Sequence, residues 1–481
     1  MAAALPLTAL PVLTLPKFVA LKSVINQKYL KLTSESEDTA GHLPAGCMIF
    51  DGDEVAIPDT KFELVKAKVE GLVHIRCCLN NKYWVRDGDS IFIVATAEKP
   101  DEDQSKSSCT LFKAEQIEDQ SDIYGFRHIQ YYQKFACHWL VDDSNMGRVH
   151  LTDYTPKRDH LYTLLNWENL VVLPKRVAFK GDNGNYLSAV TIDDHPYQQF
   201  ANTTRDAGAE YEVTNLGDGS VSIKSLSMGK FWRRSPDDWI WADTTDELTN
   251  KDTIFWPVKV GDDVVALRNL GNNNYCKRFS DSDGMDCLNA GTNTIETYAE
   301  LVVEELVVSR NIYNIKFNLS NARIYNESLV NLVTGGASNE SYGTESKTYT
   351  LKMVYKDIKT NSWNHNISIK VGVATKFEVA AIPLIVEGKI DLSTEVAWAK
   401  QWGETHTTET DFETSYGVTV LPRTKTTVTL VATHGLYDIP FSYTQSDVLS
   451  NGNTVIEDMY DGVFKGANYY SFHFDEKVEE L

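Results

Sequence analysis

The sequence has 481 residues, of which 42% are apolar and 23% charged, and its formal net charge is −21. At roughly 150 residues per domain this length corresponds to about three domains, and the composition is that of a chain able to bury a core. A strongly negative protein repels phosphate backbones and anionic lipids, which argues against a nucleic-acid partner and against electrostatic adsorption to membranes. Aromatic residues make up 11%, a content that favours strand-rich folds.

The first sixteen residues have the composition of a flexible leader. Prolines interrupt their apolar run and no basic residue precedes it, so residues 1–16 do not resemble a secretory signal peptide. The seven cysteines are odd in number and follow no metal-ligand spacing, which favours reduced thiols. We therefore expect a protein that is cytoplasmic as synthesised and that carries neither metal nor cofactor.

A short pattern recurs through residues 17–308, in which alternating apolar residues precede a basic residue, a polar turn and an aromatic residue. The first copies are centred on Leu21, Ile75 and Ile129, at steps of 54 residues, and the later ones on Phe179, Ile223 and Leu267, at steps of 44. Each copy has the pattern of a hairpin that cannot bury its own apolar face. Two sets of three copies predict two β-trefoils, over residues 17–168 and 169–308.

The aromatic positions of these copies leave two interpretations open. The aromatic that ends each turn occupies an equivalent place in every clear copy, which favours core packing over ligand contact. By strict alternation, the following Trp84 and Trp232 lie on the opposite strand face, where packing and sugar contact remain equally open. The equivalent aromatics are Tyr29, Tyr83, Tyr186, Phe231 and Tyr275.

Several sequence blocks follow one another in a specific order: Gly71–Arg76, Asn81–Tyr83, Ala95–Glu102, Cys109–Lys113, Val177–Leu187 and Lys230–Ile240. Together they resemble the amaranthin family of plant lectins. The resemblance implies tandem β-trefoils that bind the disaccharide galactosyl-N-acetylgalactosamine, the T-antigen. It also implies a head-to-tail homodimer, in which each sugar lies between the first trefoil of one subunit and the second trefoil of another.

Sugar sites combine carboxylates, which accept hydrogen bonds from hydroxyls, with aromatic rings that stack on the apolar face of a sugar. An acidic turn followed by a packed aromatic has the same composition, so a structural role stays open. The segment 86–92 is one residue shorter and poorer in Asn and aromatics than the family's loop, which leaves the identity of the glycan open. The candidates are Asn81, Trp84, Asp87, Asp89, Ser90 and Phe92 in the first trefoil, and Asp237, Asp238 and Trp239 in the second.

Residues 309–481 form a different predicted domain, with long alternating strands rich in threonine. Within it, segment 370–400 alternates as a hairpin with arms of about eleven residues and an apolar tip at 382–386, closed by Gly388. A tilted strand of that length can cross a bilayer. The candidate membrane-inserting residues are Val371, Val373, Phe377, Val379, Ile382, Pro383, Leu384, Ile385, Val386, Ile390, Leu392, Val396 and Trp398.

A single hairpin cannot span a membrane, because its edges would leave backbone groups unpaired in hydrocarbon. Several chains must therefore each contribute one hairpin to a closed barrel, and the hairpin must first be stored with its apolar row covered. An ordinary half-buried hairpin shows the same alternation, so periodicity alone does not decide between the two.

Four short blocks, Ile382–Lys389, Trp402–Thr408, Val420–Thr426 and Ile439–Tyr443, resemble in this order the aerolysin-type pore-forming module. The resemblance implies an elongated β-rich domain, ring-shaped oligomers and a transmembrane barrel. We therefore expect an all-β, non-enzymatic lectin of plant defence that forms pores in target membranes, with glycans, lipid and further copies of itself as partners. The alternative is a non-lytic agglutinin or storage lectin whose last domain serves only oligomerisation.

Overall fold

The computed structural model describes residues 15–33, 43–117, 122–141, 143–153, 155, 158–245, 250–282, 284–364, 373–394 and 402–481. Of the predicted leader only the last two residues belong to this set. The chain divides into two compact units, the first ending at Val303 and the second beginning at Glu304. The helices within the described residues are short 3-10 turns: η1 (Pro58–Thr60), η2 (Trp167–Asn169), η3 (Ala207–Ala209), η4 (Pro236–Asp238), η5 (Lys251–Thr253), η6 (Thr297–Ala299) and η7 (Leu319–Asn321).

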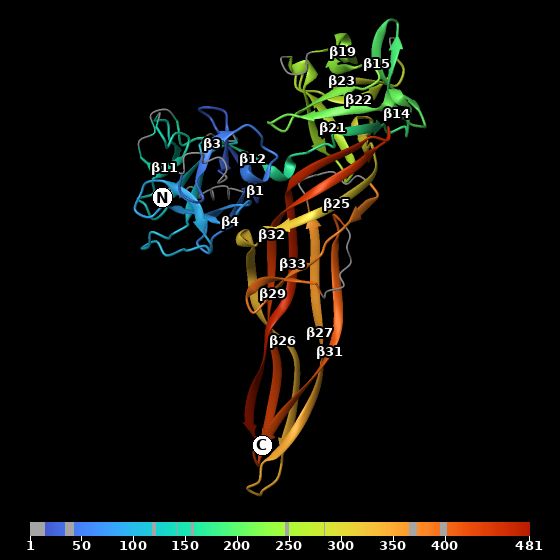
Figure 1. The fold of residues 1–481 in the computed structure, drawn as a ribbon. Coiled ribbons are helices and arrows are strands. Elements are labelled where there is room, and N and C mark those ends of the chain that lie inside the picture. The colour runs from blue at the N-terminus through green and yellow to red at the C-terminus, as the bar shows by residue number, and fades with distance from the viewer. Residues whose placement is uncertain are drawn as a thin grey trace, which may run out of the picture. The chain divides into compact units, whose positions relative to one another are not determined.

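The first unit holds two bundles of short antiparallel strands, which confirms the predicted all-β class and its tandem trefoils (Figure 1). The first bundle consists of β1 (Phe18–Ser23), β2 (Tyr29–Leu32), β3 (Met48–Gly52), β4 (Phe62–Lys66), β5 (Val73–Cys77), β6 (Tyr83–Arg86), β7 (Ile93–Ala97), β8 (Phe112–Gln116), β9 (Ile123–His128), β10 (Phe135–His138), β11 (Val149–Thr152) and β12 (Tyr162–Asn166). The second consists of β13 (Arg176–Lys180), β14 (Tyr186–Ile192), β15 (His195–Asn202), β16 (Tyr211–Asn215), β17 (Val221–Ser225), β18 (Lys230–Arg234), β19 (Ile240–Thr244), β20 (Phe255–Lys259), β21 (Val264–Asn269), β22 (Tyr275–Phe279), β23 (Cys287–Thr292) and β24 (Leu301–Glu305).

The recurring basic and aromatic residues of the sequence pattern are direct cross-strand partners. Lys22 pairs with Tyr29 and Arg76 with Tyr83, and the equivalent pairing recurs in the other copies. The ammonium of Lys22 lies 5.4 Å from the centroid of the Tyr29 ring, a distance at which a cation is attracted to the ring face. The same cation–π contact recurs at Arg127–Phe135, Lys180–Tyr186 and Lys224–Phe231, where it helps to close the hairpin.

The third copy begins three residues earlier than the 54-residue step predicts. Its basic residue is Arg127, which pairs with Phe135 and lies 3.5 Å from the centroid of that ring. Phe126, and not Ile129, is accordingly the buried equivalent of Leu21 and Ile75.

Trp84 and Trp232 belong to the cores of the two trefoils, because each is fully buried. Trp84 packs edge-on against Phe62 and Phe112, with ring centroids 5.6 and 5.7 Å apart. A register shift between Tyr83 and Trp84 interrupts the alternation, so both side chains turn inward, and the same bulge separates Phe231 from Trp232. A sugar cannot reach the Trp84 ring, so its assignment as a binding residue is wrong.

The second unit is built on long antiparallel strands (Figure 1). Its main sheet has the order β28-β25-β32-β33-β27-β31, and β26 pairs with β32. The strands are β25 (Val307–Phe317), β26 (Arg323–Asn339), β27 (Lys347–Asn364), β28 (Thr375–Phe377), β31 (Thr405–Val420), β32 (Thr424–Leu449) and β33 (Thr454–Glu480), with a separate pair formed by β29 (Ile382–Val386) and β30 (Lys389–Ser393). This agrees with the predicted elongated antiparallel domain.

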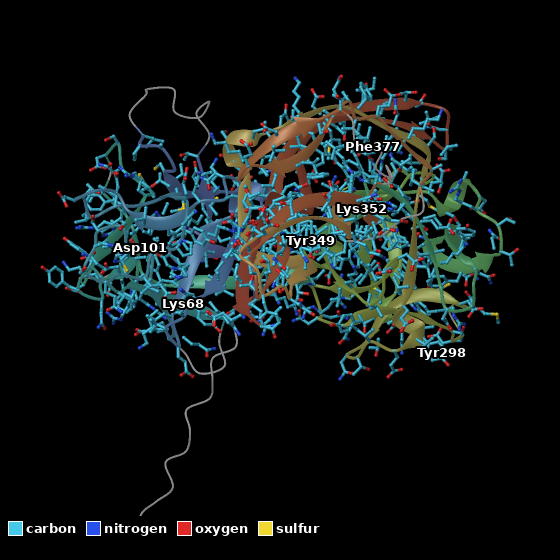
Figure 2. The ribbon with its side chains drawn as sticks, turned by 90° about the horizontal axis from the view of Figure 1, so that it is seen from below. Lys68, Asp101, Tyr298, Tyr349, Lys352 and Phe377 are labelled. Atoms are coloured by element: carbon cyan, nitrogen blue, oxygen red, sulfur yellow. The ribbon has the colours of Figure 1, made fainter. Side chains whose placement is uncertain are left out.

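Strand β27 alternates as a two-sided strand should. Met353 is buried against β31 and β32 with Tyr349 partly buried beside it, whereas Lys352 projects into solvent toward Glu413 (Figure 2). Over residues 349–357 of β27, odd-numbered side chains therefore face the interior of the second unit and even-numbered side chains face water.

A buried ion cluster ties the start of the second unit to its longest strands. The Arg310 guanidinium donates two hydrogen bonds of 2.7 and 2.8 Å to Asp447 and a third of 2.8 Å to Glu305. Burial raises the pKa of the Glu305 carboxyl above its ordinary value. Removing Arg310 would leave two buried carboxyl groups without their partner.

All seven cysteines fall within the described residues, and all but Cys78 are buried free thiols. Burial raises the pKa of Cys77 and of Cys287 to about 12. A thiol with such a pKa stays protonated at neutral pH and is a poor nucleophile.

Candidate functional site

The loop between β6 and β7 holds most of the candidates predicted in the first trefoil. The Asp87 amide donates to the Phe92 carbonyl over 2.9 Å, and the Phe92 amide donates to the Ser90 hydroxyl over 3.1 Å. Asp89 is exposed at the tip of the loop, 3.7 Å from Arg86. The chain therefore forms a closed polar turn that presents two carboxylates and ends on a half-buried ring.

Two residues that sequence reasoning missed complete this surface. Phe92 packs against Trp139 at 5.5 Å, and the Arg148 guanidinium lies 3.9 Å from the Phe92 centroid. Trp139 is half-buried, and its indole nitrogen donates to Asp143. Asp87, Phe92 and Trp139 supply a carboxylate and two aromatic faces, which is the chemistry that sugar hydroxyls and ring faces need. Arg148 is only 6% exposed and supports the Phe92 ring instead of facing a ligand.

Asn81 is only 5% exposed and does not belong to this surface. Its side-chain oxygen accepts a hydrogen bond from Arg76, which also pairs with Glu63 at 2.6 Å. Asn81 holds a left-handed turn, at φ 58°, which asparagine tolerates better than most residues. The expectation that it contacts sugar is therefore wrong.

In the second trefoil Asp237 and Asp238 form a left-handed turn, with φ of 56° and 65°. The Asp238 carboxylate accepts hydrogen bonds from Arg234 at 2.9 Å and from Asn272 at 3.0 Å, so it is already engaged. The Asp237 backbone carbonyl accepts from Asn289, and its carboxylate is exposed. Of the two, Asp237 has the side chain available for a ligand.

Trp239 is 1% exposed and packs between Tyr197 and Phe279, at 5.5 and 5.7 Å. Its ring has no free face, so stacking on a sugar contradicts its burial. The accessible aromatics of this region are Phe279, which is 37% exposed, and the parallel pair His195–Trp241 at 4.1 Å. Trp241 lies two residues beyond Trp239, which is the signal that could have identified it.

The predicted hairpin has a different turn from the one expected. The apolar segment Ile382–Val386 is a strand, β29, and not a tip, because it pairs with β30 through a two-residue turn at Glu387–Gly388. These two residues have φ of 49° and 78°, the left-handed values of a type I′ turn. The ascending arm does not pair with the descending one, since Thr375–Phe377 forms a parallel pair with β25.

Much of the apolar surface of this segment is covered by the second unit. Ile382, Leu384 and Ile385 are buried against aromatic residues of β32 and β33, with Phe377 and Val379 half-buried beside them. Phe377 (Figure 2) packs on Trp363 at 4.6 Å. Val386 and Leu392 remain 45% and 48% exposed, and Val371, Val396 and Trp398 lie outside the described residues.

Polar contacts fasten the buried strand at its centre. The Asn468 side-chain oxygen accepts from the Ile385 amide at 3.0 Å, and its amide nitrogen donates to the Ile385 carbonyl at 2.9 Å. The Tyr437 hydroxyl donates to the Pro383 carbonyl at 2.8 Å. Specific hydrogen bonds therefore hold β29 in place in addition to apolar packing.

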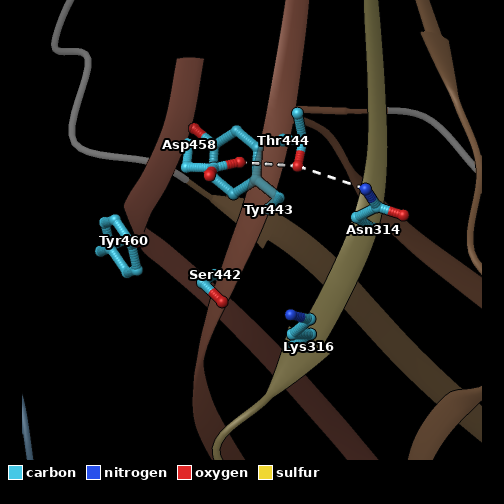
Figure 3. A pocket seen from close by; sticks show the side chains of 7 residues that line it. All are labelled: Asn314, Lys316, Ser442, Tyr443, Thr444, Asp458 and Tyr460. Carbon is cyan, nitrogen blue, oxygen red and sulfur yellow. Dashed lines mark hydrogen bonds between the residues drawn. The ribbon is translucent and has the colours of Figure 1, made fainter. Parts of the chain in front are cut away.

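A shallow hollow of about 220 Å³ lies at the bulge of β25 (Figure 3). Its lining is polar, and Thr444 donates to Asp458 at 2.8 Å while Asn314 donates to Thr444 at 3.5 Å. Because these groups satisfy one another, we assign the hollow no ligand. The lining residues are Asn314, Lys316, Ser442, Tyr443, Thr444, Asp458 and Tyr460.

Comparison with known families decides the nature of the first unit. The model of the Agglutinin domain matches residues 13–148 and 171–307, which is more than half of the chain. The chain belongs to the agglutinin-domain family. Its two agglutinin domains lie in tandem, as the amaranthin resemblance implied. None of the curated proteins matches the sequence.

Solved structures similar to this agglutinin-domain protein include lamprey immune protein, at 16% identity and TM-score 0.31, over 65% of this chain and 93% of that one. An aerolysin-like protein of Bombina maxima matches at 12% identity and TM-score 0.23, over 35% and 99%. A mosquitocidal holotoxin matches at 10% identity and TM-score 0.30, over 64% of this chain and only 36% of its own length. We rest no conclusion on TM-scores this low.

Within the described residues of the agglutinin-domain protein, no group of three His, Cys, Asp or Glu side chains is placed to hold a metal ion. In the same part of the chain, no helix has the length and apolar content that crossing a bilayer requires.

Proposed function

We propose that this protein is a glycan-binding, pore-forming lectin: its agglutinin domains bind cell-surface sugars and segment 370–400 of its second unit inserts into membranes. The observation that carries the proposal is the packing of the stored segment 373–394. The apolar side chains that alternate along it are partly buried, and its strand β29 is buried. The long strands β27 and β31 lead into and out of this segment.

The sugar step rests on the agglutinin domains. We assign galactose- and N-acetylgalactosamine-type glycans to the surface of Asp87, Phe92 and Trp139 and to that of Asp237 and Phe279. A net charge of −21 gives no attraction to anionic membranes, so glycans must supply the affinity. Several weak sites in one oligomer would add avidity.

The membrane step requires further copies of the chain. One hairpin leaves two unpaired edges, so a ring of chains must close the barrel before hydrocarbon can surround it. We assign dimerisation to the lectin domains and ring assembly to the second unit. The protein would be cytoplasmic as synthesised, would act at membranes of target cells, and would serve plant defence.

Dye leakage from liposomes tests this function. Vesicles that carry a galactosyl-N-acetylgalactosamine lipid should leak, and vesicles without the sugar should leak much less. Val379→Arg places a charge in the lipid-facing row, costs about 2–4 kcal/mol at the bilayer centre, and should abolish leakage while sparing sugar binding. Agglutination of vesicles without any leakage would establish the non-lytic agglutinin instead.

A further inference from the structure

Two antiparallel pairings have registers that disagree. One is β27–β31, whose strands lead into and out of the stored segment, and the other is β29–β30, which lies within it. In β27–β31 the last pair is Ser362 with Thr405, and in β29–β30 the first pair is Ile382 with Ser393. Twenty residues therefore separate Ser362 from Ile382, whereas twelve separate Ser393 from Thr405. A continuous hairpin cannot keep both registers, because its two arms would differ in length by eight residues.

The β27–β31 register is the better supported of the two. It runs without a shift from the pair Lys347–Val420 to the pair Ser362–Thr405, whereas the β29–β30 register covers five pairs. In the stored structure part of the ascending arm, β28, pairs with β25 instead of with the descending arm. Releasing β28 would free these residues to pair within the hairpin.

The alternation of apolar and polar residues that is typical of a strand continues through the residues of the stored turn. Even-numbered residues from Val386 to Thr394 are apolar or small and uncharged, and odd-numbered residues from Glu387 to Ser393 are charged or polar. A turn needs no such alternation, but a strand with one face in lipid does. Val386 and Leu392 are 45% and 48% exposed, so the stored hairpin leaves both of these apolar side chains partly uncovered.

We propose, resting on the pore-forming function above, that the inserted hairpin adopts the β27–β31 register and discards the stored one. Continuing that register pairs Phe377 with Ile390 and Ala381 with Val386. The turn then moves from Glu387–Gly388 to the four-residue loop Ile382–Ile385, in which Pro383 occupies the position of a type I turn that its fixed φ suits.

The eight-residue slip is even, so residues that stay on their own arm keep their face. Val386 passes from the ascending to the descending arm, and so leaves the face of Lys389 for that of Ile390 and Leu392. Gly388 moves from the turn to the middle of the descending strand, opposite Val379. The polar row Lys376, Glu378, Glu387, Lys389 and Asp391 faces water. The surface offered to the acyl chains of the bilayer is Val373, Thr375, Phe377, Val379, Ala381, Val386, Gly388, Ile390, Leu392 and Thr394.

Gly388→Val tests the relocation of the turn. Valine is strained at the stored φ of 78°, although the added side chain meets open space there, and it is favourable in a lipid-facing strand. Leakage should therefore become at least tenfold faster. Gly343→Val, at another glycine with open space, is the matched control and should leave the rate unchanged. Slower leakage by Gly388→Val would mean that the pore keeps the stored turn, and would overturn the proposal.

Two engineered cysteine pairs report the strand register directly. Both are made in a chain that carries Cys78→Ser. Ala381→Cys with Val386→Cys should cross-link only in vesicle-bound rings, because these residues lie five apart along the stored chain. Ala381→Cys with Thr394→Cys continues the stored register, so oxidising it before vesicles are added should block leakage until the bond is reduced. Full leakage with the 381–394 bond intact refutes the new register but leaves pore formation standing; absence of leakage from the wild-type chain refutes both.

Discussion

Replacing Asn468 with alanine should release the stored hairpin. Asn468 is 3% exposed and is hydrogen-bonded to both backbone groups of Ile385 at the centre of β29. Each lost hydrogen bond is worth about 1 kcal/mol, and a buried backbone group left unpaired costs about 1–3 kcal/mol. We therefore expect the free energy of opening segment 382–393 to fall by about 2–4 kcal/mol.

Since 1.4 kcal/mol corresponds to a factor of ten, a loss of about 3 kcal/mol raises the open population roughly a hundredfold. Hydrogen exchange followed by mass spectrometry should show this as faster exchange of the amides in 382–393, while the trefoil amides keep their protection. Vesicle leakage should accelerate in parallel.

Asn331→Ala is the matched control, because Asn331 is an exposed residue of β26, and surface substitutions usually change stability by less than about 0.5 kcal/mol. Unchanged exchange and leakage in Asn468→Ala would refute the idea that this contact holds the hairpin. Equal acceleration by both variants would show that the effect is not local.

Three further outcomes are expected. Trp84→Ala should lower the free energy of unfolding by about 3–5 kcal/mol, since it opens a cavity in the first trefoil; thermal denaturation checks this, and selective loss of sugar binding with full stability would contradict it. Trp139→Ala should keep the fold but weaken glycan affinity about tenfold by calorimetry if its ring contacts sugar, so unchanged affinity would reassign that surface. Burial lowers the pKa of His128 and of His138 to about 4, so both stay neutral in the folded state. The unfolded chain takes up those protons near pH 6.5, so stability should be full above pH 6.5 and fall toward pH 4 by up to roughly 3 kcal/mol per histidine; urea unfolding at pH 7 and pH 5 checks the sign, and a flat profile would contradict it.

The repeat period predicted core positions of the second trefoil well, because residues at equivalent positions of its three copies are equally buried. Phe179, Ile223 and Leu267 are all fully buried. Alternation failed at Trp84, because the bulge after Tyr83 adds a residue that no period-two pattern can register. The pairing of acidic residues with an aromatic left Trp239 open as a sugar contact or a packed ring, because such a turn has the same composition in both cases; the ring is buried.

For the hairpin, alternation identified which residues share a face but could not locate the turn. A slip by an even number of residues preserves the face of every residue that stays on its own arm, so the same sequence fits a turn at Glu387–Gly388 and one at Pro383–Leu384. The stored register is decided by tertiary contacts from Asn468 and Tyr437, which lie far along the chain. Such contacts leave no local trace in the sequence.

The buried sulfur atoms of the agglutinin domains have a consequence for how these domains respond to oxidants. Thiols that stay protonated and out of reach exchange slowly with glutathione or oxidants, because thiolate and access both limit the reaction. The six buried cysteines should therefore resist forming mispaired bridges in reducing and in oxidising surroundings alike.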